Sequence, residues 1–347
     1  MQYHPTRGYT PPDVAVTSDT MDEDTCVESL NNAVKEWFSR HRDMHCYLAV
    51  DPSQRDLTSN DVADSDLFTD LPRAAVIVDH EAFPKVNYPY LLALDLSTRA
   101  GARALAHSID IAFEDRRPES MAAGMGQRIG GWLASSVSLD EIAAHWSRLV
   151  LQHDDSGRAC ALRFYDSRSL ALLWPVLTPM QRQAMLGPAR AWHVLDARAR
   201  PVVHLASAEL RANFNLSAEQ WHQIHRHGVI NRALALHART YGRQPDAMEI
   251  EAAIAAAMRA EEFGLTDRED QLAFIGHALA WHPRFDLHPT VSQLLSLRPA
   301  DNFYTSEIGQ LTDDQIKEIQ RGAWYELLTS STPRQNRHAE TQFDGNV

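Results

Sequence analysis

The first half of the chain alternates between short apolar runs and amphipathic stretches. The apolar runs, which are typical of strands buried on both faces, are Tyr47–Val50, Ala74–Val78, Tyr90–Leu96, Gly131–Ser135, Ala161–Tyr165 and Ala191–Leu195. One intervening helix carries Leu105, Ile109 and Phe113 on one face. Another follows the capping box Ser138–Glu141. Strands separated by helices predict an α/β (α+β) lobe over residues 25–205, in which helices flank a mixed sheet.

The second half of the chain shows helical periods only. Over residues 206–328, capping boxes at Ser217–Gln220 and Thr266–Glu269 each precede an amphipathic stretch. Pro245 suits the first position of another helix, and Thr312–Leu328 has the apolar period of a final one. We therefore expect an all-α lobe to follow the α/β lobe.

Both ends of the chain lack such periods. Residues 1–24 are rich in Pro, Thr and Asp, and we expect a flexible acidic leader. Residues 329–347 are polar, and we expect them to be disordered. No basic stretch followed by an apolar run begins the chain, and no stretch approaches the roughly twenty apolar residues that cross a bilayer. We expect a cytoplasmic protein without stable membrane insertion.

The charge balance narrows the classes of partner. The 347 residues include 46 acidic and 33 basic side chains, which give a formal net charge of −13 with histidine neutral. A nucleic-acid-binding protein needs a basic face to neutralise phosphates, so we expect no nucleic-acid partner. The balance fits a soluble protein, or one that meets a basic partner surface.

The cysteines indicate a reducing compartment. Cys26, Cys46 and Cys160 are odd in number and far apart, and they form no Cys-x-x-Cys pair. This pattern is not that of a disulfide framework or of a thiolate zinc site.

The segment Ala161–Trp192 is the most informative part of the chain. It begins as a predicted strand and passes through Asp166 into an amphipathic stretch that ends near Leu177. The capping box Thr178–Gln181 then begins a second short helix, and Gly187-Pro188 ends it. The segment therefore predicts a strand, two helices and a return toward a strand.

This segment resembles the effector adaptors, or chaperones, of bacterial type VI secretion (the Tap/Tec type), formerly catalogued as a domain of unknown function. The resemblance rests on Arg163, Phe164, Tyr165, Asp166, Arg168, the Leu-rich stretch with Trp174, Leu177-Thr178-Pro179, Leu186-Gly187-Pro188 and Trp192. It extends weakly from about Cys46 to about Ser330 through the order of elements. The family more often has proline at the position of Ser167, so a looser turn is expected here.

The resemblance implies a non-catalytic binding protein. Such an adaptor holds a cognate effector and loads it onto the VgrG spike protein, so the expected partners are the effector and VgrG. It implies no catalytic residue, and we expect no metal and no cofactor. The residues that carry the resemblance are then either partner-binding or structural.

The group Arg163, Asp166 and Arg168 has two interpretations. At a strand-to-helix junction, a carboxylate can accept backbone N–H groups and pair with an arginine. The group could therefore be a docking surface or hinge for a partner, or a charged cap that holds the turn. A catalytic use has no support, because no base, nucleophile or metal ligand accompanies it in the sequence.

The histidines suggest an alternative function. Seventeen are present, most densely in the run His222–His227, where His222 and His225 can share a helical face as metal ligands do. A metal-dependent hydrolase that uses this helical half is one alternative, although the run lacks a His-Glu-x-x-His pattern. A cytosolic immunity protein is another. Whether the run binds metal stays open at the level of sequence.

Aromatic and Leu residues offer a candidate groove. Leu170–Leu177, Trp281, Phe285 and Phe303 could line a surface that receives an apolar segment of an effector. Residues at such spacing also form ordinary cores, and both interpretations remain possible.

Overall fold

A computed structural model of the chain describes four stretches, namely residues 23–57, 66–207, 214–299 and 302–331. The leader predicted over residues 1–24 lies outside them except for its last two residues, which begin helix α1 (Glu23–Arg40). The first three residues of the tail predicted over residues 329–347 are helical and end helix α14 (Ala323–Ser331), and the rest lies outside the described stretches.

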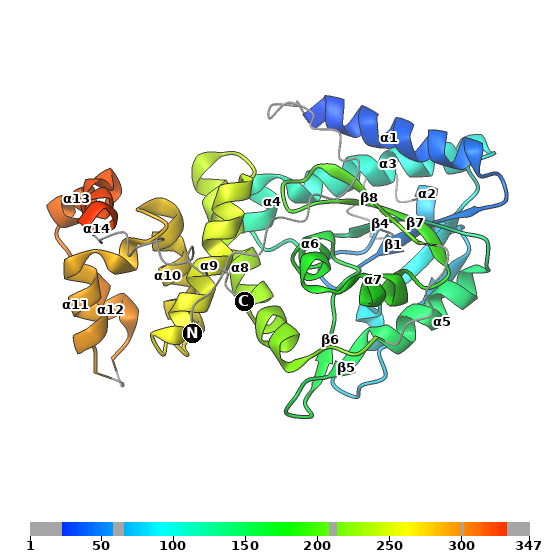
Figure 1. Cartoon of the computed structure of the whole chain (residues 1–347). Helices are drawn as coiled ribbons and strands as arrows, with labels where there is room; N and C mark the ends of the chain where they lie inside the picture. Colours follow the sequence, from blue (N-terminus) through cyan, green and yellow to red (C-terminus); the bar gives the residue numbers. More distant parts are fainter. Residues whose placement is uncertain (1–22, 58–65, 208–213, 300–301, 332–347) are drawn as a thin grey trace, which may run out of the picture.

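A six-stranded sheet forms the centre of the N-terminal lobe (Figure 1). Its order is β2-β3-β1-β4-β7-β8. The strands are β1 (His45–Val50), β2 (Arg73–Ala75), β3 (Tyr90–Leu94), β4 (Ile129–Ser135), β7 (Ala189–Leu195) and β8 (Pro201–Leu205). A separate two-stranded hairpin consists of β5 (Leu151–His153) and β6 (Ala159–Ala161).

All described pairings of the sheet are antiparallel, whereas the sequence predicts a mixed sheet. A helix between two strands normally connects parallel neighbours, and this is why the sequence predicts a mixed sheet. Strands β3 and β4 run in the same direction, because each is antiparallel to β1. However, β1 lies between them, so this crossover creates no parallel hydrogen-bonded pair.

Helices cover both faces of the sheet. They are α1, α2 (Asp66–Thr69), α3 (Arg99–Arg116), α5 (Leu139–Leu149), α6 (Ser167–Val176) and α7 (Pro179–Leu186), with a 3₁₀ turn at Lys85–Asn87. Helix α4 (Pro118–Ala122) follows α3 and packs against α8. Side chains of a strand alternate between faces. Accordingly, Cys46, Leu48 and Val50 of β1 pack in one core with α1 and α3. Tyr47 and Ala49 pack in a second core with α5, α6 and α7.

Two strand predictions need correction. The run Ala161–Tyr165 is not a strand of the sheet: only Ala161 belongs to β6, and the residues after it form the turn into α6. Phe164 and Tyr165 are nevertheless fully buried, and burial alone does not separate a strand from a buried turn in sequence. The sequence also misses the edge strand β8, which is only partly buried and begins with Pro201.

The C-terminal lobe contains only helices among its described residues. They are α8 (Ala218–Tyr241), α9 (Ala247–Glu262), α10 (Arg268–Ala280), α11 (Pro289–Leu297), α12 (Tyr304–Ile308), α13 (Asp313–Arg321) and α14, with a 3₁₀ turn at Phe285–Leu287. These helices share a core of their own. The predicted fold class, an α/β lobe with a sheet flanked by helices followed by an all-α lobe, is confirmed.

Local signals decide where these helices begin and end. The predicted capping box at Ser217 is present, with the serine side chain accepting from the N–H of Gln220. Asp267, rather than Thr266, caps α10. The single helix predicted over Thr312–Leu328 is two helices, because Gly322 adopts a left-handed conformation between them (φ 71°).

Helix α8 joins the two lobes. It packs against α4 and α6 on one side and against α9 and α10 on the other (Figure 1). The side-chain amides of Gln181 in α7 and Gln220 in α8 bond to each other at 2.9 and 2.7 Å. Arg232 of α8 donates to the carbonyl of Ala122 at 2.6 Å. Among the described helices, none combines the length and the apolar character that a membrane span requires.

Candidate functional site

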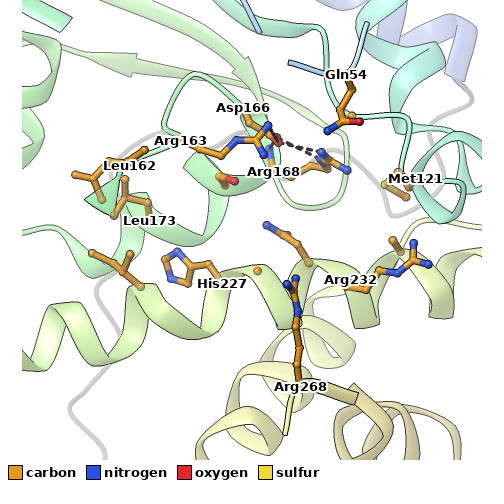
Figure 2. Close-up of a pocket in the computed structure, with 18 residues that line it drawn as sticks. Gln54, Met121, Leu162, Arg163, Asp166, Arg168, Leu173, His227, Arg232 and Arg268 are labelled. Carbon is orange, nitrogen blue, oxygen red and sulfur yellow. Dashed lines mark hydrogen bonds and ion pairs between the residues drawn. The ribbon is translucent and has the colours of Figure 1, made fainter. Parts of the chain in front are cut away.

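A cavity of about 360 Å³ lies between the N-terminal lobe and α8 (Figure 2). Its wall on the N-terminal side is the turn that leads into α6, residues 163–168, which we call the junction. Its opposite wall is one face of α8, and Arg268 extends toward it from the start of α10 (Figure 2). The charged residues that line the cavity are Arg163, Asp166, Arg168, Arg232 and Arg268.

Asp166 organises the junction as the N-cap of α6. Its Oδ1 accepts from the backbone N–H of Arg168 at 3.0 Å. The Arg168 guanidinium donates back through Nε to Oδ1 at 3.2 Å and through Nη2 to Oδ2 at 2.9 Å. Burial alone would raise the pKa of Asp166, but the adjacent positive charge of Arg168 outweighs it and lowers the pKa. The carboxylate is therefore ionised and fixed.

Arg163 links the junction to the end of β1. Its Nη2 donates to Asp51 Oδ2 at 2.6 Å and to Ser53 Oγ at 3.2 Å, and it lies 3.8 Å from Asp166 Oδ2. Burial works to lower the pKa of Arg163, but the charges of Asp51 and Asp166 raise it overall. Because 41% of the side chain remains exposed, Arg163 both ties two segments together and faces the cavity.

A second buried ion network lies behind the junction. Asp115, at the end of α3, accepts from the guanidinium of Arg128 and from its backbone N–H at 2.7 Å. Arg55 adds a further contact to Asp115 at 2.5 Å. Next in the chain, Arg116 is fully buried and donates to the carbonyl of Ala197, while its Nε and Nη1 have no partner in the described structure. Burial lowers the pKa of Arg116 to about 10, and the positive charge of Arg168 contributes to this shift.

The cavity is positive although the chain is acidic. Four arginines line it against one carboxylate, Asp166, which is already paired with Arg168. Arg232 and Arg268 belong to the exposed residues of the helical lobe. Burial lowers the pKa of His227, which also lines the cavity, to about 4, so its ring is neutral at pH 7. This arrangement is suited to an anionic group of a partner.

Only part of the predicted motif reaches this cavity. Arg163, Asp166 and Arg168 come together there. Phe164 and Trp192 instead lie in the core, where each ring centroid is 5.1 Å from that of Trp146. The neighbouring predicted residue, Tyr165, is buried beside Phe164.

The remaining predicted residues hold elements in place. Trp174 is half-buried and stacks on His204 of β8, with centroids 3.8 Å apart. Gly187 ends α7 with φ 55°, and a Cβ there would lie 2.1 Å from Nε2 of His145. The carbonyl of Pro188 accepts from Ser135 Oγ at 2.8 Å. These contacts are structural and lie outside the cavity lining.

The wall supplied by α8 was not among the predicted site residues. Its cavity-lining residues recur with helical spacing at Ile224, His227, Gly228, Asn231, Arg232 and Ala235. This spacing is visible in the sequence, but it does not distinguish a cavity wall from an ordinary packed face. No sequence signal connects Arg268, more than thirty residues further along, with that face.

A second, apolar cavity of about 300 Å³ lies beside the first and shares His227 with it. Helices α6, α8 and α9 line it, through residues that include Leu172, Pro175, Ile230 and Ile254. The stretch Leu170–Leu177, predicted to form a groove, therefore contributes some residues to the core and others to this cavity. Leu170 and Leu173 are in the core, and Leu172 and Pro175 face this cavity.

The two histidines considered as metal ligands do not form a paired site. His222 is exposed, and the ring of His225 approaches the hairpin β5–β6 of the other lobe. There, His225 forms a cluster with Asp154 and Cys160 whose ligand atoms all lie within 4.8 Å of one another. The cluster was not predictable from the sequence, because more than sixty residues separate His225 from Asp154 and Cys160.

Comparison with known proteins identifies one segment of the chain. Residues 86–184 match the model of a family described as a domain of unknown function (DUF4123). No curated protein and no solved structure matches the chain significantly. The matched segment runs from the 3₁₀ turn before β3 into α7, and it includes the whole junction. This chain thus contains a segment that is similar to the DUF4123 family and that supplies the N-terminal wall of the cationic cavity.

Proposed function

We propose that this protein is an adaptor, or chaperone, that binds a cognate type VI secretion effector and loads it onto the VgrG spike. The match over residues 86–184 supports this, because the DUF4123 domain occurs in the context of such adaptors. The observation that carries the proposal is the position of the matched junction, which forms one wall of a positive cavity between two lobes.

The two neighbouring cavities suit a polypeptide partner. A segment that crosses α8 can place an acidic side chain near Arg232 and Arg268 and an apolar side chain near Ile230 and Ile254. A few such anchors supply most of the binding energy of protein interfaces. The surrounding contact, typically about 1,600 Å² in total, excludes water from them.

The proposed mode of action is contact alone. In this proposal the protein works in the bacterial cytoplasm, without catalysis and without a cofactor in the loading step. The junction is held by internal ion pairs, so it offers a preorganised surface, which lowers the ordering cost of binding. Arg232 and Arg268 are exposed, and their attraction for an acidic segment is weakened by salt.

The test is co-expression with the effector encoded beside this gene, followed by affinity capture of the effector and of VgrG. We expect higher soluble yield of the effector and a complex that survives purification. The double variant Arg232→Ala/Arg268→Ala should bind the effector about tenfold more weakly, because it removes two cavity charges. The matched control Arg40→Ala/Arg321→Ala removes the same charge outside the cavity and should bind normally.

Two outcomes would contradict the proposal. One is purified protein that binds neither the effector nor VgrG. The other is complete inhibition of the effector's toxic activity by the complex with no effect on its delivery, which would favour an immunity protein. Turnover of a small molecule that depends on His225 would favour the hydrolase alternative.

A further inference from the structure

Three potential metal ligands meet where the hairpin β5–β6 approaches α8. They are Asp154 in the turn of the hairpin, Cys160 in β6 and His225 in α8, which we call the ligand cluster. Asp154 Oδ2 lies 3.7 Å from Cys160 Sγ and 3.4 Å from His225 Nε2. The hairpin of the N-terminal lobe therefore contributes two ligand atoms, and α8 contributes the third.

The two distances from Asp154 Oδ2 fit a tetrahedral metal site, and the ligand atoms of Cys160 and His225 lie within 4.8 Å of each other. Zinc binds sulfur at about 2.3 Å and nitrogen or oxygen at about 2.0–2.2 Å, so tetrahedral ligand atoms lie roughly 3.3–3.7 Å from one another. The nitrogen–oxygen distance of 3.4 Å between His225 and Asp154 exceeds the usual hydrogen-bond length of about 2.9 Å. The oxygen of Asp154 is thus placed at ligand spacing from both partners.

The hairpin turn holds the Asp154 carboxylate in position. Its Oδ1 accepts from the backbone N–H groups of Ser156 and Arg158, at 3.1 and 2.9 Å, and from Ser156 Oγ at 2.7 Å. Hydrogen bonds from Ser156 hold the pKa of Asp154 well below its usual range. Oδ1 is therefore committed to the turn, and the charged Oδ2 faces the cluster.

The other two ligands are ordered but accessible. The His225 ring stacks on Trp221, with centroids 5.6 Å apart, and its side chain is 35% exposed. Cys160 is partly exposed, in contrast to the buried Cys26 and Cys46. A fourth position can therefore be taken by water, as in zinc sites with three protein ligands.

One neighbouring cation competes for the same oxygen. Arg158 Nε lies 3.2 Å from Asp154 Oδ2, but 67% of the Arg158 side chain is exposed. It can turn into solvent when a metal ion enters, at the cost of a weak exposed ion pair.

We infer that Asp154, Cys160 and His225 form a Zn²⁺ site that fastens the hairpin β5–β6 to α8. The mixture of thiolate, imidazole and carboxylate favours zinc over calcium or magnesium, which prefer oxygen ligands. On binding, Zn²⁺ takes the lone pairs of the three ligands, and the Cys160 thiol releases its proton to solvent. Ala161 and Leu162, which follow Cys160 directly, line the cationic cavity, so the metal holds one edge of that cavity in place. This inference does not depend on the adaptor proposal.

The test uses the full chain, stripped of metal and titrated with ZnCl₂ in a calorimeter. We expect one equivalent to bind and the melting temperature to rise. Cys160→Ser and His225→Ala should each weaken the affinity at least tenfold. Co²⁺ should give a thiolate charge-transfer absorption that Cys160→Ser abolishes. The control His222→Ala removes an exposed histidine from the same helix and should bind Zn²⁺ as the unmodified chain does.

A second measurement needs no variant. Alkylation by iodoacetamide, located by mass spectrometry, should modify Cys160 in the metal-free protein and slow at least tenfold with one equivalent of Zn²⁺. Absence of stoichiometric binding would overturn the inference. Unchanged Zn²⁺ affinity in Cys160→Ser would also overturn it, as would a loss of affinity in His222→Ala as large as that in His225→Ala. A rate of Cys160 alkylation that is the same with and without Zn²⁺ would overturn it as well.

Discussion

The two lobes place their buried charges differently. In the N-terminal lobe, ion pairs join segments far apart in the chain, as Arg163 does with Asp51 across 112 positions. In the helical lobe, the buried Asp270 accepts from the backbone N–H groups of Tyr304 and Thr305, 34 and 35 positions away. The less buried Asp246 and Asp267 cap helices locally. Another buried carboxylate of this lobe, Asp286, pairs with Arg259 across 27 positions.

This contrast gives the cationic cavity two unlike walls. The junction wall is held by buried carboxylates, so its arginines have little freedom. The opposite wall consists of Arg232 and Arg268 on exposed helix surface. In the proposed adaptor, the junction would set the geometry of binding. On the helical wall, Arg268 would adapt to the partner, whereas Arg232 is held by its bond to the carbonyl of Ala122. The predictions below test this contrast, from the largest expected effect to the smallest.

The largest effect is expected at Asp115. Asp115→Ala removes the buried partner of Arg128, which then keeps only the half-exposed Glu114, and should lower the free energy of unfolding by about 3–5 kcal/mol. Asp286→Ala in the helical lobe should cost less, because Asp286 accepts from one arginine side chain, whereas Asp115 accepts from two and from a backbone N–H. Urea unfolding of both variants measures the difference. An equal or larger loss in Asp286→Ala would contradict the contrast between the lobes.

An intermediate effect is expected at Gly187. Gly187→Ala forces a positive φ on alanine and pushes the His145 ring off its bond to the carbonyl of Ala184. We expect a loss of about 1–3 kcal/mol in unfolding free energy. The matched variant Gly242→Ala, at the end of α8, also has positive φ but meets no atom within 4 Å, and it should cost only about 1 kcal/mol. If thermal or urea unfolding ranked the two variants in the reverse order, the packing argument at Gly187 would fail.

The smallest effect concerns pH. Burial lowers the pKa of His193 in β7 and of His277 in α10 to about 4, below the value of 6.5 for an unperturbed histidine. The unfolded chain therefore binds protons that the folded chain does not, and stability falls as the pH drops from 6.5 toward 4. The free energy of unfolding should fall by about 1 kcal/mol per histidine as the pH drops by one unit from 6.5.

Replacing either histidine tests which lobe the pH dependence of unfolding comes from. His193→Leu should flatten the pH dependence of unfolding of the sheet lobe, and His277→Leu that of the helical lobe. Denaturation followed at several pH values shows whether both variants act on one cooperative transition or on two. A pH slope that stays unchanged in both variants would exclude these two groups as its source.

Features set by neighbouring residues were predictable from the sequence. The capping boxes at Ser138, Thr178 and Ser217 are all present, because each requires only a side chain and a backbone N–H three residues apart. The order of sheet lobe and helical lobe was predictable for a similar reason, since apolar periods of two kinds follow one another along the chain.

Features that depend on distant segments were not predictable. The apolar run Ala161–Tyr165 has the composition of a strand but forms a buried turn, because Asp166 begins α6 directly after it. The motif around Arg163 was visible as a pattern, yet its division between cavity and core depends on the packing of Phe164 and Trp192 against Trp146.

The sequence by itself determined the helix starts capped by Ser138, Thr178 and Ser217, the apolar strands other than Ala161–Tyr165, and the charged turn before α6, because these follow from interactions over a few residues. The tertiary structure alone decided that β1 separates β3 from β4, which excludes a parallel pair. It also brought Arg232 and Arg268 opposite Arg163, and His225 beside Asp154. Contacts of this kind arise when the burial of apolar faces draws distant segments together, and the pattern within each segment does not specify which segment it will meet.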